Sequence, residues 1–252
     1  MSNGIFFAKG MTVAFTDISL SFSAREFDQS QSTMTLKVGF DACIPWLEIA
    51  LEHMTALNGL VANSEEVWSG EDAKAKGELL NNEFRGAMQA IVAAATAVDA
   101  FYSNVRSRVE IDKETVKSWQ KGRASRPARI AETLRTAFTI KQENFETVSD
   151  YLHQIYQFRD KVVHPAGGLT PPVLHPGMKA GVEERFVTFR HYNALAIVHV
   201  VLELISQLAA KGHSTNKKLQ DYCAYLEKLI GPLRERYPLP KLQPPSPNQT
   251  PS

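Results

Sequence analysis

The chain has 252 residues, 44% of them hydrophobic, which is enough to bury a core in one large domain or two small ones. It has 28 basic and 27 acidic residues. The net charge of +1 excludes a whole-protein field that would draw it to nucleic acid or membranes. Cys43 and Cys223 are too few for a disulfide scaffold and lack the paired spacing of a zinc site, so we expect a reducing, cytoplasmic location.

From the sequence, neither a targeting signal nor a membrane-spanning segment is expected. The N-terminal residues lack a basic start, a sustained apolar run and a small-residue cleavage site, so no signal peptide is expected. The most apolar segment, residues 194–210, contains His199 and Glu203. We interpret it as too short and too polar for a membrane-spanning helix. We therefore expect a soluble protein without a membrane partner.

The N-terminal 38 residues lack helical periodicity. Ile18, Leu20 and Phe22 alternate with serines, which indicates a strand, and residues 34–38 are a second short strand candidate. Helical spacing begins near residue 41 and continues to a plausible stop at Gly59. We expect a small β or irregular N-terminal cap together with a first helix over residues 1–60.

The rest of the chain is mostly helical in pattern. The apolar stripe over 82–106 predicts a long helix whose alanines allow close packing. The glycine- and proline-rich residues 165–182 predict a loop, and residues 185–189 are a candidate strand that would complete the N-terminal sheet. Further helices are predicted at 113–122, 127–140 with Pro127 in its first turn, 143–164, 191–211 and 214–237, the last with a Ser or Thr cap and a kink near Gly231 and Pro232.

These elements together predict a mainly α protein. Its fold would be an antiparallel helical bundle over residues 61–237, with the N-terminal unit at 1–60. The proline-rich residues 238–252 have too few large apolar groups to fold alone and are expected to be a disordered tail.

One helix carries a charge where the core should be. Val148, Leu152, Ile155 and Val162 recur every three or four residues, and Arg159 falls inside this stripe. At about 100° per residue, Arg159 lies within roughly 20° of Val148 around the helix. A desolvated charge without a partner costs several kcal/mol, on the order of the buried-ion penalty, so chance rarely leaves one there.

Asp99 lies at the edge of the stripe on the 82–106 helix and is the expected partner of Arg159. The arginine-bearing helix is expected to end at His164, because Pro165 lacks the amide donor and disfavours helical geometry in the residue before it. A purely structural explanation exists, since basic residues at a helix C-terminus interact favourably with the helix dipole.

The segment RDKVVH begins with Arg159 and Asp160 and ends with His164, so four residues separate the arginine from the histidine. It resembles the motif of the HEPN family (higher eukaryotes and prokaryotes nucleotide-binding). That motif is an arginine, four to six residues and a histidine, with asparagine, aspartate or histidine commonly following the arginine. The helix at 82–106 is similar to the family helix that packs on the motif helix, and Asp99 is similar in placement to an acidic residue of some members. The resemblance covers roughly residues 80–165. The chain is longer than a minimal member, and a proline-rich loop follows its motif.

The resemblance implies an endoribonuclease that needs no metal or other cofactor, with Arg159, His164, Asp160 and Asp99 as its catalytic residues. A histidine titrates near neutral pH and can move a proton, whereas an arginine stays charged and matches two phosphate oxygens. One histidine cannot readily serve as both base and acid. The resemblance supplies the second histidine through a homodimer, and it implies a toxin or defence role with an antitoxin or regulatory protein as a partner.

The spacing within the motif raises a geometric objection. Five residues along a regular helix rotate a side chain by about 140°, so Arg159 and His164 would not share a face. We expect Pro165 to force the backbone off the helical path at His164, which would let the imidazole turn back towards the arginine.

A basic segment precedes the motif. Against the single acid Glu132 it holds five basic residues, and four of them are the candidate RNA contacts: Lys121, Arg123, Arg126 and Arg129. Local positive charge suffices to neutralise phosphates. A solvated helix face explains the same residues. RNA is therefore one candidate partner, with Trp119, Tyr156 and Phe158 as candidates for base stacking or for the core.

No metal site is expected. His199 and Glu203 are four residues apart, which favours an internal pair, and His164 and His175 lack further ligands. Two functions from different classes remain open. One is the metal-independent endoribonuclease, and the other is a catalytically inactive HEPN-like helical dimer that acts as a binding or regulatory module, with Arg159 paired to Asp99 for structural reasons.

Overall fold

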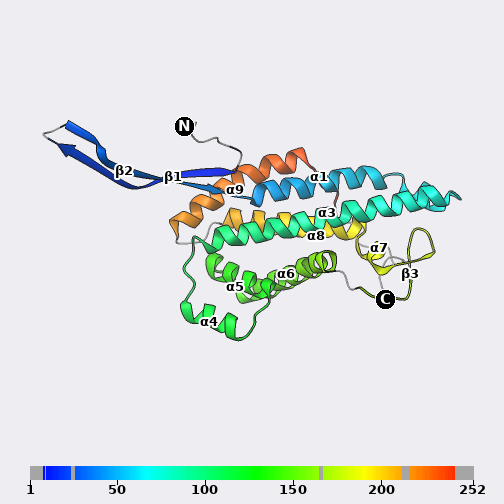
Figure 1. Ribbon diagram of the computed structural model, residues 1–252. Coiled ribbons are helices and arrows are strands. Elements are labelled where there is room, and N and C mark those ends of the chain that lie inside the picture. Colours follow the sequence, from blue (N-terminus) through cyan, green and yellow to red (C-terminus); the bar gives the residue numbers. More distant parts are fainter. Residues whose placement is uncertain (1–7, 9, 24–25, 165–166, 212–215, 242–252) are drawn as a thin grey trace.

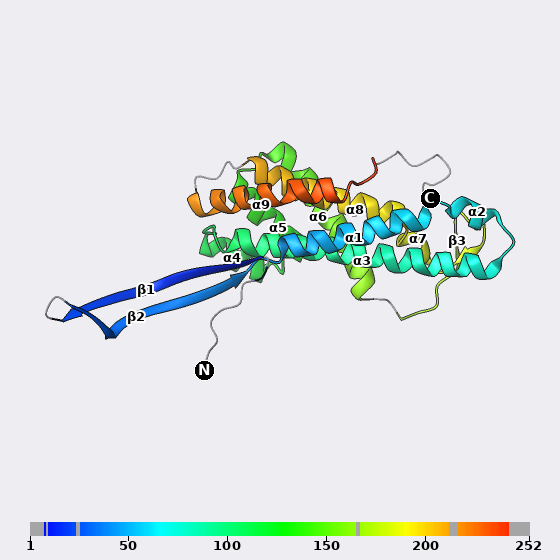
Figure 2. The same ribbon diagram turned by 90° about the horizontal axis from the view of Figure 1, so that it is seen from above.

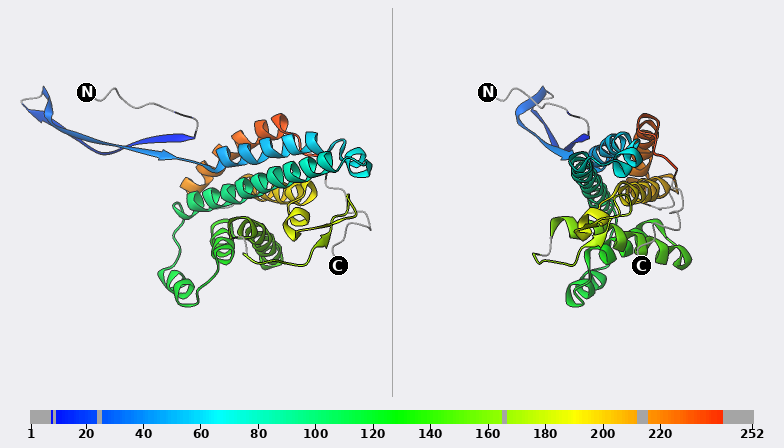
Figure 3. Two further views of the ribbon diagram at one scale, coloured as in Figure 1. Left: turned by 45° about the vertical axis from the view of Figure 1, so that its right-hand side comes forward. Right: turned by 90° about the vertical axis from the view of Figure 1, so that its right-hand side faces the viewer.

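The structure is a computed structural model that describes residues 8, 10–23, 26–164, 167–211 and 216–241. Over these ranges it is mainly helical, as predicted, with nine helices and two two-stranded antiparallel sheets. Figures 1 and 3 show α3 and α8 in the middle of the bundle, with α1 and α9 on one side and α5 and α6 on the other. The helices are α1 Cys43–Val61, α2 Ser64–Ser69, α3 Ala73–Arg106, α4 Lys113–Lys121, α5 Arg126–Phe138, α6 Gln142–Val163, α7 Glu184–Thr188, α8 His191–Lys211 and α9 Lys217–Arg236.

The central helix α3 begins nine residues before the predicted start at 82. Asp72 caps it, because its Oδ1 accepts hydrogen bonds from the amides of Lys74 at 2.8 Å and Ala75 at 3.1 Å. Among the nine added residues only Leu79 is buried, so the apolar stripe did not reveal them. Further along α3, buried alanines such as Ala87, Ala90 and Ala94 face the core that α1 and α8 share with it. The first helix, which the sequence placed with the N-terminal unit, therefore packs within the bundle.

The predicted strand at 185–189 is wrong. These residues lie in α7 and its C-terminal cap, with Glu183 as the N-cap. Phe186 and Phe189 are three residues apart, and both rings pack on Phe84 of α3, with centroids 5.0 and 5.8 Å away. The spacing of these aromatic residues is thus helical. The loop of residues 167–182, as far as the structure describes it, contains only the short pair β3 (Val173–Leu174) and β4 (Gly181–Val182).

Helix α8 has the predicted bounds. A carboxylate from α3 holds its N-terminus: Glu83 accepts a hydrogen bond from the amide of His191 at 2.9 Å and forms an ion pair with Arg190 at 3.6 Å. The sequence-based judgement that this segment is too short to span a membrane is wrong, since residues His191–Ala210 are long and apolar enough by length and composition. In the structure α8 packs against α1, α3, α6 and α9.

The last helix, α9, is capped by Asn216, whose side chain accepts from the amides of Lys218 and Leu219. The predicted serine or threonine cap falls on Ser214 and Thr215, outside the described residues. Pro232 lies inside α9, which continues to Arg236. Of the predicted tail, residues 242–252 lie outside the described part of the chain.

The N-terminal strands form a hairpin arm. The predicted strands are confirmed but are longer than expected: β1 runs over Met11–Ser23 and β2 over Glu26–Phe40, paired antiparallel from Met11 opposite Phe40. Figures 1 and 2 show that this ribbon projects away from the end of the bundle where α1 begins, so the N-terminal sheet extends outward and does not cover the helices. We call β1 and β2 together the arm.

Asp41 fixes the root of the arm to the bundle. Its amide donates to the carbonyl of Gly10 at 2.8 Å, and Gly10 has the positive φ of 89° that favours glycine. Its buried carboxylate accepts from the amide of Cys43 at 2.9 Å and from the side chain of Asn104 on α3 at 3.0 Å. Burial raises the pKa of Asp41, although the Cys43 amide, the Tyr222 hydroxyl and the charge of Arg108 act in the opposite direction.

Asp41→Ala is therefore expected to lower the free energy of unfolding by about 1–3 kcal/mol, because the Cys43 amide and the Asn104 side chain lose their buried acceptor. Asp41→Asn keeps an acceptor and removes the buried charge, so its cost should be smaller. Since the folded-state pKa is raised, the folded form holds the proton more tightly than the unfolded form. The wild type should thus lose stability relative to Asp41→Asn as the pH rises above 3.8. Urea unfolding across a pH series measures both effects, and equal losses in the two variants would contradict this explanation.

Candidate functional site

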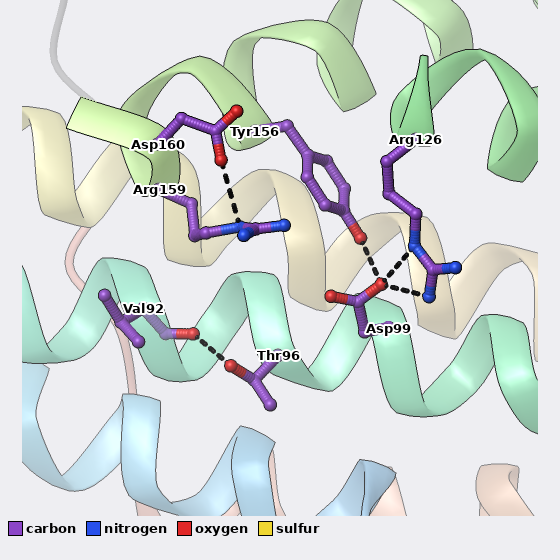
Figure 4. A network of polar contacts seen from close by, with 7 residues as sticks. All are labelled: Val92, Thr96, Asp99, Arg126, Tyr156, Arg159 and Asp160. Carbon is purple, nitrogen blue, oxygen red and sulfur yellow. Dashed lines mark hydrogen bonds and ion pairs between the residues drawn. The ribbon is translucent and has the colours of Figure 1, made fainter. Parts of the chain in front are cut away.

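The candidate site lies in the last two turns of α6. The guanidinium of Arg159 is stacked over the ring of Tyr156, with Cζ 5.0 Å from the ring centroid, and its Nε is 3.4 Å from Oδ1 of Asp160. Figure 4 shows these three side chains side by side. The Arg159 side chain is 27% exposed. The charge that falls inside the apolar stripe is thus only partly buried, and it lies against an aromatic ring and a neighbouring carboxylate.

Asp99 does not pair with Arg159. The expected ion pair is wrong, because Oδ1 of Asp99 accepts from Nε and Nη2 of Arg126, at 2.9 and 2.6 Å. The hydroxyl of Tyr156 donates to the same oxygen at 2.7 Å (Figure 4). Arg126 is the first residue of α5, and its guanidinium also lies over the ring of Tyr102, 4.7 Å from the centroid. Both arginines were available in the sequence, and only the packing of α5 on α3 selects between them.

We call Asp99, Arg126 and Tyr156 the Asp99 network; it joins α3, α5 and α6. Burial raises the pKa of Tyr156, and the hydrogen bond and charge of Asp99 raise it further, so the phenol remains a donor. Burial disfavours the charge of Arg126, but the hydrogen bonds and charge of Asp99 outweigh it and raise the pKa of the guanidinium. The network therefore places a neutral aromatic ring beneath Arg159 and leaves the guanidinium of Arg159 outside the ion pair.

His164 ends α6. Its φ of −128° and ψ of 64° lie outside the helical region, as the following Pro165 predicted, and its amide donates to the carbonyl of Asp160 at 2.9 Å. Pro165 itself lies outside the described residues. The imidazole is exposed, and no hydrogen bond connects it to Arg159 among the contacts of the described chain. Arg159 and His164 are thus both accessible to solvent at the end of one helix, without a direct bond between them.

The four candidate RNA contacts have different environments. Lys121 and Arg123 are exposed at the junction between α4 and α5, where Arg123 has a positive φ of 50°. Arg126 is engaged by Asp99. The Nε of Arg129 is buried and has no hydrogen-bond partner in the part of the chain that the structure describes. Lys121 and Arg123 are therefore the two of the four candidates that are exposed and are not engaged by Asp99.

A shallow apolar groove borders the end of α6 and was not identified from the sequence. It has a volume of about 350 Å³ and is lined by side chains of α1, α3 and α6, namely Trp46, Ile49, His53, Met88, Gln89, Val92, Ala93, Val162 and Val163. Val163 directly precedes His164. The residues come from helices distant in sequence, so no local pattern could have indicated the groove.

The residues considered for a metal are engaged elsewhere. The predicted pair of His199 and Glu203 is wrong: Nε2 of His199 contacts the carbonyl oxygen of Pro240 at 2.7 Å, and Glu203 pairs with Arg234 at 2.6 Å. His175 is buried against Trp68, and burial together with the charge of Arg190 lowers its pKa to about 4. Among the described residues, no three histidine, cysteine or acidic side chains are grouped as metal ligands would be.

A larger cavity of about 620 Å³ lies away from the motif. It is formed by the junction between α5 and α6 and by α8, and Tyr151, His199 and Glu203 are among its lining residues. Two of its polar lining residues already have partners: Glu203 pairs with Arg234 of α9, and His199 contacts the carbonyl of Pro240 after α9. None of the four candidate catalytic residues lines this cavity.

Comparison with protein-family models, with curated proteins and with solved structures finds no match to the chain.

A double-mutant cycle tests the assignment of Asp99. Asp99→Ala and Arg126→Ala should be non-additive in the free energy of unfolding, with a coupling of about 0.5–1.5 kcal/mol that partial exposure of both side chains keeps modest. The cycle of Asp99→Ala with Arg159→Ala should show a smaller coupling, transmitted only through Tyr156. Chemical unfolding of the single and double variants measures both values. A larger coupling with Arg159 would restore the ion pair expected from the sequence.

Proposed function

We propose that the protein is a metal-independent HEPN-like endoribonuclease that cleaves RNA by attack of a 2′-hydroxyl and acts as a homodimer. The observation that supports this proposal is the pairing of Asp99 with Arg126. It removes the structural role that an Arg159–Asp99 ion pair would have given to the arginine. Arg159 is left partly exposed, five residues before His164 near the end of α6, and among the described residues its ionic partner is the neighbouring Asp160.

The chemistry assigns a role to each side chain. Attack of the 2′-hydroxyl on the phosphate forms a phosphorane with added negative charge, which the planar guanidinium of Arg159 stabilises through two oxygens. His164 accepts the proton of the 2′-hydroxyl or delivers one to the leaving 5′-oxygen. Asp160 orients the guanidinium through its contact with Nε, and Asp99 acts at a distance by holding Tyr156 beneath it. Asp160 and Asp99 are therefore positioning residues.

The proposal requires a homodimer with the two motif helices at or near the interface, because one histidine supplies only one of the two proton transfers. Lys121 and Arg123, both exposed, are the charges best placed to follow the RNA backbone. The toxin or defence role, the antitoxin and the cytoplasmic location stay predictions from the sequence.

His164→Ala should lower cleavage of single-stranded RNA in EDTA by about 10²–10⁴-fold, which is the usual contribution of a proton-transfer group. Thermal stability should change little, because the side chain is exposed. Arg159→Ala should lose a comparable factor through the unstabilised phosphorane. His153→Ala is the matched control, since His153 is an exposed histidine on the same helix about three turns earlier, and it should retain activity.

The products should carry a 2′,3′-cyclic phosphate and a 5′-hydroxyl, because the attacking group belongs to the RNA. Mass spectrometry of the fragments identifies both ends. A folded wild type that leaves varied RNAs intact would favour the inactive binding or regulatory module. Cleavage that stops on chelation would contradict the proposed mechanism.

A further inference from the structure

The arm has one apolar face. In an antiparallel pair, residues directly opposite each other point to the same side, and the register places Val13 opposite Val38 and Phe15 opposite Leu36. The alternate pairs, such as Thr12 with Gly39 and Thr16 with Thr35, point to the other side. Near the bundle the ribbon therefore has an apolar face and a polar face.

A bulge keeps this face continuous along the arm. The apolar residues of β1 fall on odd positions up to Phe15 and on even positions from Ile18, so a regular strand would move the second group to the polar side. Between the pairs Thr16–Thr35 and Ser19–Thr33, β1 has one residue more than β2, and Asp17 adopts a positive φ of 53° there. The bulge returns Ile18 and Leu20 to the apolar side.

We define the arm face by nine residues that share one side of the ribbon: Met11, Val13, Phe15, Ile18, Leu20, Met34, Leu36, Val38 and Phe40. Seven of these large side chains are 37–60% exposed, and Figures 1 and 2 and the left view of Figure 3 show the ribbon extending away from the helices. A two-stranded hairpin alone is marginally stable in water, and stability requires further strands or a covered face. The bundle of the same chain does not cover this face.

The area and charge of the arm face fit a second copy of the same chain. Aromatic side chains bury on the order of 150–250 Å² each when fully covered, and aliphatic ones lie near or below the lower end of that range, so seven half-exposed ones offer roughly 600 Å² per arm. Two arms packed face to face would bury about 1,200 Å², the lower limit for a specific interface. The face contains no charged side chain, so two copies bring no like charges together.

The small number of charged residues on the arm disfavours nucleic acid or a membrane as the partner of this face. Between Met11 and Leu20 and between Ser32 and Phe40 the only charged residues are Asp17 and Lys37. Binding to a phosphate backbone requires several lysines or arginines, and interfacial membrane elements carry many on their polar face. A two-fold axis that lies between two copies and runs parallel to the planes of their ribbons, in contrast, places identical apolar faces against each other, as in an isologous dimer.

We propose that the arm is a dimerisation element whose apolar face packs against the arm of a second copy of this chain. This inference goes beyond the proposed ribonuclease function and does not depend on it, since the arms would associate whether or not the chain cleaves RNA. Joined arms would hold two bundles at high effective concentration, which favours the second contact that the ribonuclease proposal requires between the motif helices.

Analytical ultracentrifugation of the full-length chain tests the proposal. The wild type should be a dimer at micromolar concentration, and Phe15→Thr, Leu36→Thr and Val38→Thr combined should weaken the dimer at least tenfold while circular dichroism of the helices is unchanged. Threonine keeps strand propensity and removes the apolar surface. The matched control combines Thr12→Ser, Thr33→Ser and Thr35→Ser on the polar face and should remain dimeric.

Disulfide trapping provides a second measurement that does not depend on the stability of the triple variant. Under mild oxidation Leu36→Cys should give a covalent dimer, and Lys37→Cys on the opposite face should not; the native Cys43 and Cys223 are buried. A monomeric wild type, a triple variant that stays dimeric, or equal cross-linking at both positions would overturn the proposal. Wild-type monomers that sediment with phosphatidylcholine–phosphatidylserine vesicles would assign the face to a membrane surface and would overturn it too. Loss of RNA cleavage with an intact dimer bears only on the ribonuclease proposal.

Discussion

The carboxylate of Asp99 is the contact on which the candidate site depends. One of its oxygens accepts from Arg126 at the start of α5 and from Tyr156 in α6, so a single side chain of α3 fixes two further helices. The rotation of α6 about its own axis is set by Tyr156, and Arg159, three residues later, is stacked on the ring so oriented. The direction in which the arginine and the end of α6 face solvent thus follows from a contact made on α3.

The chain treats its apolar side chains in two ways: the bundle buries them, and the arm leaves them exposed on one face. In the bundle, alanines of α3 permit close helix packing, and the apolar side chains of α1, α8 and α9 are buried in one core. In the arm, a bulge at Asp17 aligns the apolar side chains on one face and the bundle leaves them uncovered. The two parts meet at Asp41, which is bound both to the start of the arm and to α3. Loss of the Asp41 contacts should therefore change the orientation of the arm relative to the bundle, while the core of the bundle stays folded.

The sequence predicted the elements with strong periodicity and failed where partners lie far apart in the chain. Helix α8 has the expected bounds because its apolar residues continue from end to end, whereas the first turns of α3, in which only Leu79 is buried, have no apolar stripe to mark them. Residues 185–189 are too few to show a helical period by themselves, and the packing of Phe186 and Phe189 on Phe84, which favours the helix, is a tertiary contact. Helix packing likewise decides which ion pairs form. Asp99 pairs with Arg126 and not with Arg159, and Glu203 pairs with Arg234. The motif residues themselves were identifiable, because their spacing and the following proline are local features.

The most direct test of the account is whether RNA contacts the end of α6. A 2′-deoxy-substituted RNA oligonucleotide cannot be cleaved, because it lacks the attacking hydroxyl, and it can be titrated into isotopically labelled protein while nuclear magnetic resonance follows the side-chain signals. The account predicts shifts of the Arg159 Nε–H and His164 imidazole signals at one common affinity, with His153 unchanged. Shifts confined to Lys121, Arg123 and their neighbours, or no shifts at all, would contradict the assignment of Arg159 and His164 to a phosphate-binding site.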